Sequence, residues 1–154
     1  MKQYTRNELR KLIIIKTKEI GLFSDNAAEL LIGTCAQESC LGKYRKQLGG
    51  GPALGIFQME PATFVDIHIN VLRFNPLLLK KVMKAAEVKS LKAEDLVLND
   101  NLAVCMARVH YYRFKEAIPD NLEGWAHYWK KYYNTSAGRG TEEEFIKNYK
   151  TLCL

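Results

Sequence analysis

Apolar side chains recur at three- and four-residue steps through most of this chain, and this periodicity constrains the fold more than any other feature of the sequence. Between residues 24 and 38, Ala27, Leu30, Leu31, Thr34 and Cys35 fall on one face of a helix. Similar spacing predicts further helices that begin near residues 5, 61, 76, 102, 122 and 141. No segment alternates with period two, so we expect little or no β-structure. We predict a single all-α domain over residues 1–154.

Local signals place several helix ends. Thr5 and Glu8 form a capping-box pattern, and Thr141 and Glu144 form a second one. Pro61 suits the first turn of a helix. The segment Asn99–Asn101 can cap a helix over 102–117, and Pro119-Asp120 breaks the chain before a helix over 122–133. A short turn or helix is expected at 92–98.

Glu38 extends the apolar face of the segment 24–38 close to its C-terminal end. Gly42 can stop this helix, and the five glycines between residues 41 and 55 exclude a regular helix and allow close backbone approach to a ligand. Lost hydration and the negative end of the helix dipole both raise the pKa of a carboxyl group placed there. A raised pKa suits an acid that donates a proton near neutral pH. The alternative is a Glu38 side chain that turns out to solvent at a frayed helix end.

Three motifs occur in the order typical of soluble lytic transglycosylases, a family of the lysozyme-like superfamily that also contains the goose-type lysozymes. The motifs are Gln37-Glu38-Ser39, then Gly55-Ile56-Phe57-Gln58 followed by a helix start at Pro61, then the aromatic segment 132–138. They resemble the family's Glu-Ser, Gly-Leu-(Met/Phe)-Gln with Pro-x-Thr, and aromatic-Tyr-Asn motifs. The resemblance covers residues 24–145 and implies a lysozyme-like helical domain with a substrate groove. The step from Asn134 to Gly138 is longer than the family's Asn-x-Gly spacing.

The resemblance also implies roles for individual residues. Glu38 and Tyr133 would be catalytic, with the Tyr133 hydroxyl orienting the Glu38 carboxyl group. The residues implied to contact substrate are Ser39, Gly55, Ile56, Phe57, Gln58 and Asn134. From sequence context alone, Tyr133 also fits a core position and Asn134 a helix C-cap. Trp125 and Trp129 fit a packed core face.

The implied reaction cleaves the β-1,4 bond between N-acetylmuramic acid and N-acetylglucosamine in peptidoglycan and forms 1,6-anhydro-N-acetylmuramic acid. Most glycoside hydrolases need two carboxyl groups, whereas no Asp or Glu lies between Glu38 and Glu60. This gap favours the transglycosylase reaction, in which the resemblance makes Glu38 first the acid and then the base. A hydrolytic muramidase of the same fold is the alternative, with Glu60 or Asp66 as the second carboxylate.

No cofactor or metal is expected. The three histidines, His68, His110 and His127, have no His or Cys companion at metal-ligand spacing. A Gly-x-Ser-x-Gly motif, which would indicate a serine hydrolase, does not occur. The four cysteines also lack such spacing and are predicted to be free thiols.

The formal net charge of +6 favours a polyanionic partner. The resemblance identifies that partner as peptidoglycan glycan strands. A basic helical nucleic-acid-binding protein is a distant alternative, because no recognition helix or clustered basic stripe is apparent. The apolar run 12–15 is too short for the core of a signal peptide, and no stretch reaches transmembrane length. We therefore expect a monomer of the phage endolysin or virion-lysin type, made in the cytoplasm without membrane insertion and acting on the bacterial cell wall.

Overall fold

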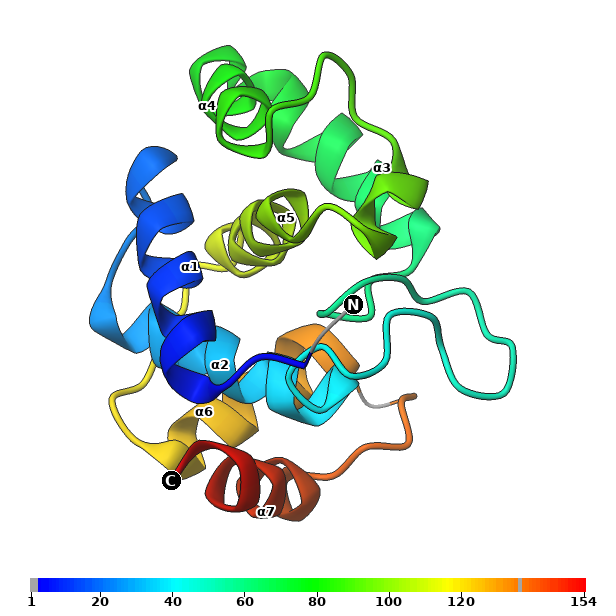
Figure 1. The fold of residues 1–154 in the computed structure, drawn as a ribbon. Coiled ribbons are helices and arrows are strands. Elements are labelled where there is room, and N and C mark those ends of the chain that lie inside the picture. The colour runs from blue at the N-terminus through cyan, green and yellow to red at the C-terminus, as the bar shows by residue number, and fades with distance from the viewer. Residues whose placement is uncertain (1–2, 136) are drawn as a thin grey trace.

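The computed structural model describes residues 3–135 and 137–154 and confirms an all-α fold. No strand occurs in this part of the chain, where the β-pairing consists of isolated bridges from Leu54 to Lys46 and to Met59. The α-helices in Figure 1 are α1 (Arg6–Glu19), α2 (Asp25–Ser39), α3 (Pro61–Asn70), α4 (Pro76–Ala86), α5 (Asp100–Tyr112), α6 (Leu122–Trp129) and α7 (Glu142–Cys153). Two 3-10 helices, η1 (Leu72–Phe74) and η2 (Ala93–Val97), and one π-helical turn, η3 (Lys130–Asn134), complete the regular structure described.

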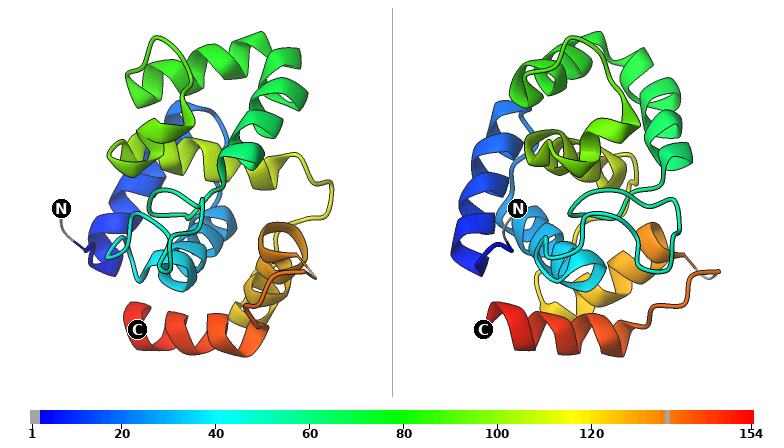
Figure 2. Two further views of the ribbon diagram at one scale, coloured as in Figure 1. Left: turned by 90° about the vertical axis from the view of Figure 1, so that its right-hand side faces the viewer. Right: turned by 45° about the vertical axis from the view of Figure 1, so that its right-hand side comes forward.

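Helices α2 and α5 occupy the centre of the molecule. α5 contacts α1, α2, α3 and α4, whereas α2 contacts α1, α5, α6 and α7. In Figures 1 and 2, α3 and α4 lie on one side of α5, and α6 and α7 lie on the opposite side of the molecule. The glycine-rich segment 40–60 connects the two groups along one edge. Within the described residues, no helix is both long enough and apolar enough to cross a bilayer.

The capping residues position the helix starts as predicted. Thr5 accepts a hydrogen bond from the Glu8 N–H, and the Glu8 carboxylate accepts one from the Thr5 N–H, which completes the capping box. At the start of α7, Thr141 accepts a hydrogen bond from the Glu144 N–H at 3.1 Å. Pro61 occupies the first position of α3.

The ends of two helices differ from the prediction. α5 ends at Tyr112, not at residue 117. The apolar pattern predicted a longer helix because it includes Phe114, which is partly buried. Phe114 lies in the connector that follows α5, and its ring stacks on Tyr132 at a centroid distance of 4.2 Å. α6 ends at Trp129, and the chain continues into η3 with a π-helical hydrogen-bond pattern. An apolar pattern therefore identified buried residues there without identifying their backbone geometry.

α7 packs against α2 through a glycine. Gly33 is buried in the middle of α2, and the Phe145 ring of α7 is fully buried against it. A Cβ atom at residue 33 would lie 2.3 Å from Cζ of Phe145. Glycine weakens a helix by roughly 0.5–1 kcal/mol relative to alanine, and the close approach of these two helices explains its presence.

We expect Gly33→Ala to lower the free energy of unfolding by about 1–3 kcal/mol, because the added methyl group overlaps the Phe145 ring. Urea denaturation measures this change. The matched control is the double variant Gly33→Ala/Phe145→Leu, in which the smaller side chain makes room for the methyl group. Its loss should be clearly less than the sum of the two single losses, and strict additivity would argue against a direct contact.

Candidate active site

A cleft of about 890 Å³ opens between the glycine-rich segment and the region around η3. In the right-hand view of Figure 2, the teal segment 40–60 and the orange segment that follows α6 lie on the same side of the molecule. The cleft is lined by Glu38 from the end of α2, by side chains between Tyr44 and Thr63, by His110, Arg113 and Phe114, and by residues 131–135, 137 and 138. The three sequence motifs therefore contribute to one cavity.

Glu38 is the next-to-last residue of α2, and its side chain points into the protein toward Trp129. Removal from water raises the pKa of its carboxyl group from 4.5 to about 7. A hydrogen bond from the Trp129 indole Nε1 to Oε2, at 3.0 Å, favours the ionised form and opposes this rise. The predicted direction of the pKa shift is confirmed, and the alternative of a side chain turned out to solvent is wrong. Near neutral pH, Glu38 is therefore able both to donate and to accept a proton.

Trp129 is the functional contact that sequence reasoning missed. Its ring is fully buried against Phe145, as the core assignment predicted. The indole N–H needs an acceptor when it is buried, and Glu38 supplies that acceptor. The available signal was the pairing of a buried indole with a buried acid, but the two residues lie 91 positions apart in the sequence.

Tyr133 lies in the same cleft, but its hydroxyl group contacts a different partner from the one that the resemblance implied. It donates to the backbone carbonyl of Phe57 at 2.6 Å. The ring packs against His110 and Tyr111, with centroid distances of 5.2 and 5.4 Å. Burial, followed by the nearby Glu38 carboxylate, raises the pKa of Tyr133 well above its ordinary value. Tyr133 thus joins η3 to the Gly55–Gln58 motif and stays protonated beside Glu38.

Ser39, directly after Glu38, is fully buried and holds the glycine-rich segment in place. Its hydroxyl group donates to the Ile56 carbonyl at 2.6 Å and accepts from the Gly42 N–H at 2.9 Å. Ile56 and Phe57 are themselves buried at 0% and 1% exposure. These three residues, which the resemblance assigned to substrate contact, support the wall of the cleft from behind rather than line it.

Gly55 and Gln58 form a tight turn at that wall. Gly55 has a φ of +79°, and a Cβ atom there would lie 2.4 Å from the Leu96 carbonyl oxygen, so only glycine fits. The Gln58 side-chain amide donates to the Gly55 carbonyl at 3.0 Å, and Gln58 itself lines the cleft. On the opposite wall, Asn134 also lines the cleft, and its Oδ1 accepts from Lys130 Nζ at 2.6 Å.

A partly buried ion pair anchors the glycine-rich segment to α5. The Arg45 guanidinium forms a two-pronged contact with Asp100, through Nη1 to Oδ1 and through Nη2 to Oδ2 at 2.9 Å. The Tyr4 hydroxyl group donates to the same carboxylate at 2.6 Å. Arg45 also donates to the Val97 carbonyl at 3.2 Å. The chain before α1, the cleft wall and the start of α5 are therefore joined at one carboxylate.

Two carboxyl groups, those of Glu38 and Glu60, are among the described residues that line the cleft. Glu60 is the exposed N-cap of α3, and its side chain makes no capping hydrogen bond. Asp66, the other acid considered from the sequence, accepts from Arg113 at 2.5 Å and from Asn70 at 2.6 Å. These hydrogen bonds lower the pKa of Asp66. Glu60 is therefore better placed than Asp66 to act with Glu38.

His110 supports the cleft as a neutral side chain. Burial lowers its pKa to about 4. Arg113 Nη2 lies 3.1 Å from Nδ1, and because arginine only donates, Nδ1 must accept. The proton is then on Nε2, which donates to the Tyr132 carbonyl at 2.8 Å. His110 fixes the backbone of η3 and has no free nitrogen for proton transfer.

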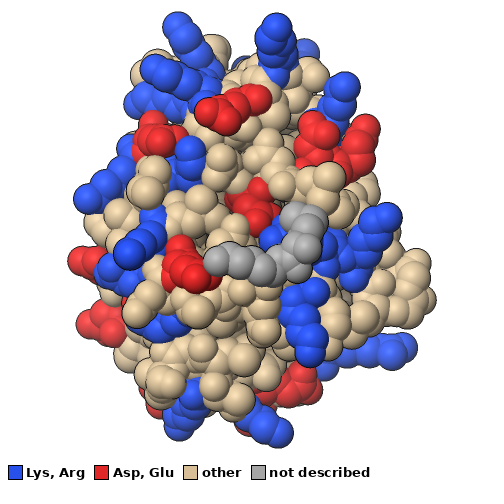
Figure 3. Space-filling view, in the orientation of Figure 1, with Lys and Arg blue, Asp and Glu red and all other residues tan. Residues whose placement is uncertain are grey.

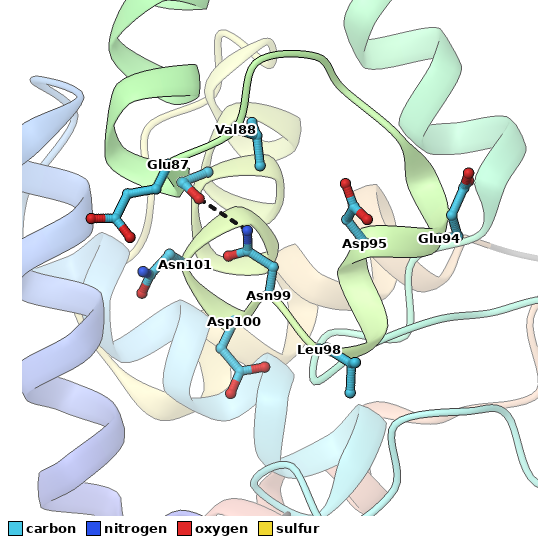
Figure 4. Close-up of a pocket in the computed structure, with 9 residues that line it drawn as sticks. Glu87, Val88, Glu94, Asp95, Leu98, Asn99, Asp100 and Asn101 are labelled. Carbon is cyan, nitrogen blue, oxygen red and sulfur yellow. Dashed lines mark hydrogen bonds between the residues drawn. The ribbon is translucent and has the colours of Figure 1, made fainter.

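A second hollow, of about 640 Å³, lies between α4 and the start of α5 (Figure 4). Asn99 crosses it, donating to the Ala86 carbonyl at 2.9 Å and accepting from the Leu102 N–H at 2.9 Å. Asn99 thereby ties the end of α4 to the start of α5. Acidic side chains surround this hollow, but within the described residues no group of three or more His, Cys, Asp or Glu side chains is arranged to hold a metal ion.

Basic side chains are spread over the surface. On the face in Figure 3 they stand around the edge of the molecule, and acidic side chains lie between them. Several basic groups are also ion-paired, including Arg6 with Glu29 at 2.6 Å and Lys131 with Glu116 at 3.2 Å. Basic and acidic side chains are thus interspersed on this face.

No family model, curated protein or solved structure matches this chain. Its chemistry is therefore inferred from the geometry of the cleft, in which one acid of raised pKa is held by Trp129 between two walls.

The raised pKa of Glu38 makes stability depend on pH. The native state binds the Glu38 proton more tightly than the unfolded chain, so the contribution of Glu38 to stability should fall as pH rises between about 4.5 and 7 and then level off. His110, with its lowered pKa, contributes in the opposite direction, so the Glu38 effect is the difference between the wild type and a Glu38 variant. Glu38→Gln has no carboxyl group to ionise in the buried site. It should therefore be more stable than the wild type by roughly 3 kcal/mol at pH 8, with little difference at pH 4. Urea denaturation across pH measures it, and Glu60→Gln is the control for loss of an exposed cleft carboxylate. Equal pH profiles for wild type and Glu38→Gln would show that Glu38 is not desolvated.

Trp129→Phe should raise the pKa of Glu38 above about 7, because phenylalanine cannot donate to the ionised carboxylate. Carbon-13 NMR titration of the Glu38 carboxyl group measures the shift. Trp125→Phe is the matched control, since its indole donates to the Pro119 carbonyl at 2.6 Å instead. An unchanged or lowered pKa in Trp129→Phe would contradict the role assigned to this hydrogen bond.

Proposed function

We propose that this protein is a peptidoglycan lytic transglycosylase that cleaves the bond between N-acetylmuramic acid and N-acetylglucosamine. The observation that carries the proposal is Glu38, whose pKa of about 7 lies near the working pH of a proton-transfer catalyst and whose side chain lines a cleft large enough for sugars. The resemblance of the three motifs to the transglycosylase core supplies the substrate class.

The proposed reaction uses Glu38 twice. Its protonated carboxyl group donates a proton to the glycosidic oxygen as the bond to the anomeric carbon breaks. The resulting carboxylate then takes the proton of the C6 hydroxyl group, whose oxygen bonds to the anomeric carbon and closes the 1,6-anhydro ring. Water is not consumed, and Glu38 ends protonated as it began. A pKa near 7 suits both steps, because neither protonation state is strongly favoured at neutral pH.

The surroundings of Glu38 support this cycle. Trp129 donates to Oε2 and so stabilises the carboxylate formed between the two steps. Tyr133 and Ser39 keep their hydroxyl groups on backbone carbonyls, which positions η3 and the Gly55–Gln58 turn as walls of the cleft. Tyr44 and Phe114 add aromatic surface to the lining, which suits the apolar faces of sugar rings.

Glu60 favours a second candidate, a hydrolytic muramidase. Its exposed carboxylate lines the same cleft, and a second carboxylate is what hydrolysis needs to activate water or to act as nucleophile. The two candidates share Glu38 as the acid and differ in whether Glu60 takes part. The net charge of +6 suits approach to an anionic cell wall, and on the face in Figure 3 acidic side chains stand among the basic ones, which does not favour nucleic acid there.

Mass spectrometry of the muropeptides released from purified peptidoglycan tests the proposal. A transglycosylase should release products lighter by one water than the hydrolytic ones, with no new reducing ends. Glu38→Gln should reduce release about 100-fold or more, because the general acid is lost. Glu60→Gln should retain wild-type release.

Three other results would each contradict a different part of the proposal. Reducing-end muramic acid together with loss of release in Glu60→Gln would establish the hydrolase. Full release by Glu38→Gln would remove Glu38 from the mechanism. Absence of any soluble product from folded wild-type protein would contradict both enzymatic candidates.

A further inference from the structure

Arg108 is a buried cation with no acidic partner among the residues that the structure describes. The residue lies on α5, one turn before the helix ends, and is 9% exposed. Its Nε donates to the Leu22 carbonyl at 2.8 Å, which fixes the direction of the guanidinium group. Of the guanidinium nitrogens, Nη1 has no hydrogen-bond partner among the described residues and is closed off from bulk water.

This arrangement is unfavourable for the protein alone. Burial lowers the pKa of Arg108, and the neighbouring groups that oppose the effect are the hydroxyl groups of Tyr128 and Tyr112 rather than a carboxylate. Buried charges in proteins are normally paired, because an unpaired one loses its hydration without compensation. By contrast, the partly buried Arg45 and Arg113 each contact an aspartate. Arg108 therefore stands out as a guanidinium whose partner is not part of the chain described.

The guanidinium group lines a pocket of about 360 Å³ together with the first turn of α2. Ser24, the N-cap, uses its side chain to accept from the Ala27 N–H, and Asn26 also lines the pocket. The N-terminus of this 15-residue helix carries partial positive charge and backbone N–H groups without helical partners. The cation and the helix terminus thus favour negative charge at the same place.

The rest of the pocket is largely aromatic. Tyr112, Phe114 and Tyr128 contribute to its lining, from the end of α5, the following connector and α6. Glu116 is the acid that lines this pocket, and its carboxylate accepts from Lys131 at 3.2 Å, which offsets its charge. A single uncompensated cation favours a ligand with one negative charge over a ligand with two. The aromatic walls favour a ligand whose remaining part is apolar.

We propose that this pocket is a binding site for a carboxylate with a small apolar body, in which the ligand's carboxylate pairs with the Arg108 guanidinium beside the N-terminus of α2. Because Nε is taken by the Leu22 carbonyl and Nη1 is closed off, the ligand's carboxylate would pair with the guanidinium group through Nη2. Phe114 lines both this pocket and the cleft that contains Glu38, so the two sites are neighbours with different linings. The proposal does not depend on the cleft's activity, and either can fail alone.

Nitrogen-15 NMR titration of the full chain with sodium benzoate at constant ionic strength tests the site. We expect saturable shifts of the Asn26 and Tyr112 amides with a dissociation constant on the order of 1 mM. Arg108→Met, which keeps the apolar stem and removes the charge, should weaken binding by about tenfold or more. Arg73→Met is the control, because it removes an exposed arginine outside the pocket and should leave binding unchanged.

Further titrations separate the sources of the carboxylate. Tighter binding of N-acetyl-alanyl-alanine than of benzoate would support the site and identify a peptide C-terminus as the source, whereas the reverse order would support it and identify a free aromatic acid. Inorganic phosphate binding more tightly than either would overturn the carboxylate assignment. Absence of saturable shifts in the wild type, or equal binding by folded Arg108→Met, would overturn the site. The wild-type titration remains decisive if Arg108→Met does not fold.

Discussion

The burial of α2 is the constraint on which the rest of the structure depends. α1, α5, α6 and α7 all pack against it, and Gly33 lets α7 come close. Its last two residues then point in different directions, because successive helical positions are about 100° apart. The Ser39 side chain lies in the core and forms hydrogen bonds with Gly42 and Ile56, while the Glu38 carboxyl group accepts a hydrogen bond from Trp129 at the cleft. One helix end thus fixes both the acid and the wall opposite it.

The cleft is held by contacts between segments that are far apart in the sequence. Arg45 and Asp100 join one wall to α5, and Tyr133 joins η3 to the carbonyl of Phe57. These hydrogen bonds are partly buried, so losing one leaves a polar group that water reaches only in part. The protein therefore holds Glu38 in a preformed, desolvated site, which is the condition for a carboxyl group to keep its proton near neutral pH.

Two desolvated ionisable groups in this molecule, Glu38 and Arg108, differ in whether they can change protonation state near neutral pH. Glu38 is desolvated but receives a hydrogen bond from Trp129, and its raised pKa lets it change protonation state. Arg108 is desolvated and cannot be neutralised at ordinary pH, so an unpaired guanidinium persists beside an aromatic pocket. The first arrangement suits proton transfer, and the second suits a bound anion. Stability alone would not favour a buried carboxyl group at residue 38 or a buried, unpaired guanidinium group at residue 108.

The sequence by itself determined the all-α class, the starts of α1, α3, α4, α6 and α7, and the position of Glu38 at the end of an apolar helix face, because these depend on local periodicity and capping. Tertiary structure decided the rest. The end of α5, the burial of Ser39, the Phe57 carbonyl as partner of Tyr133, and the indole that holds Glu38 all depend on segments brought together in space. Periodicity reports which side chains leave water, but it carries no information about which distant polar group each buried donor will meet.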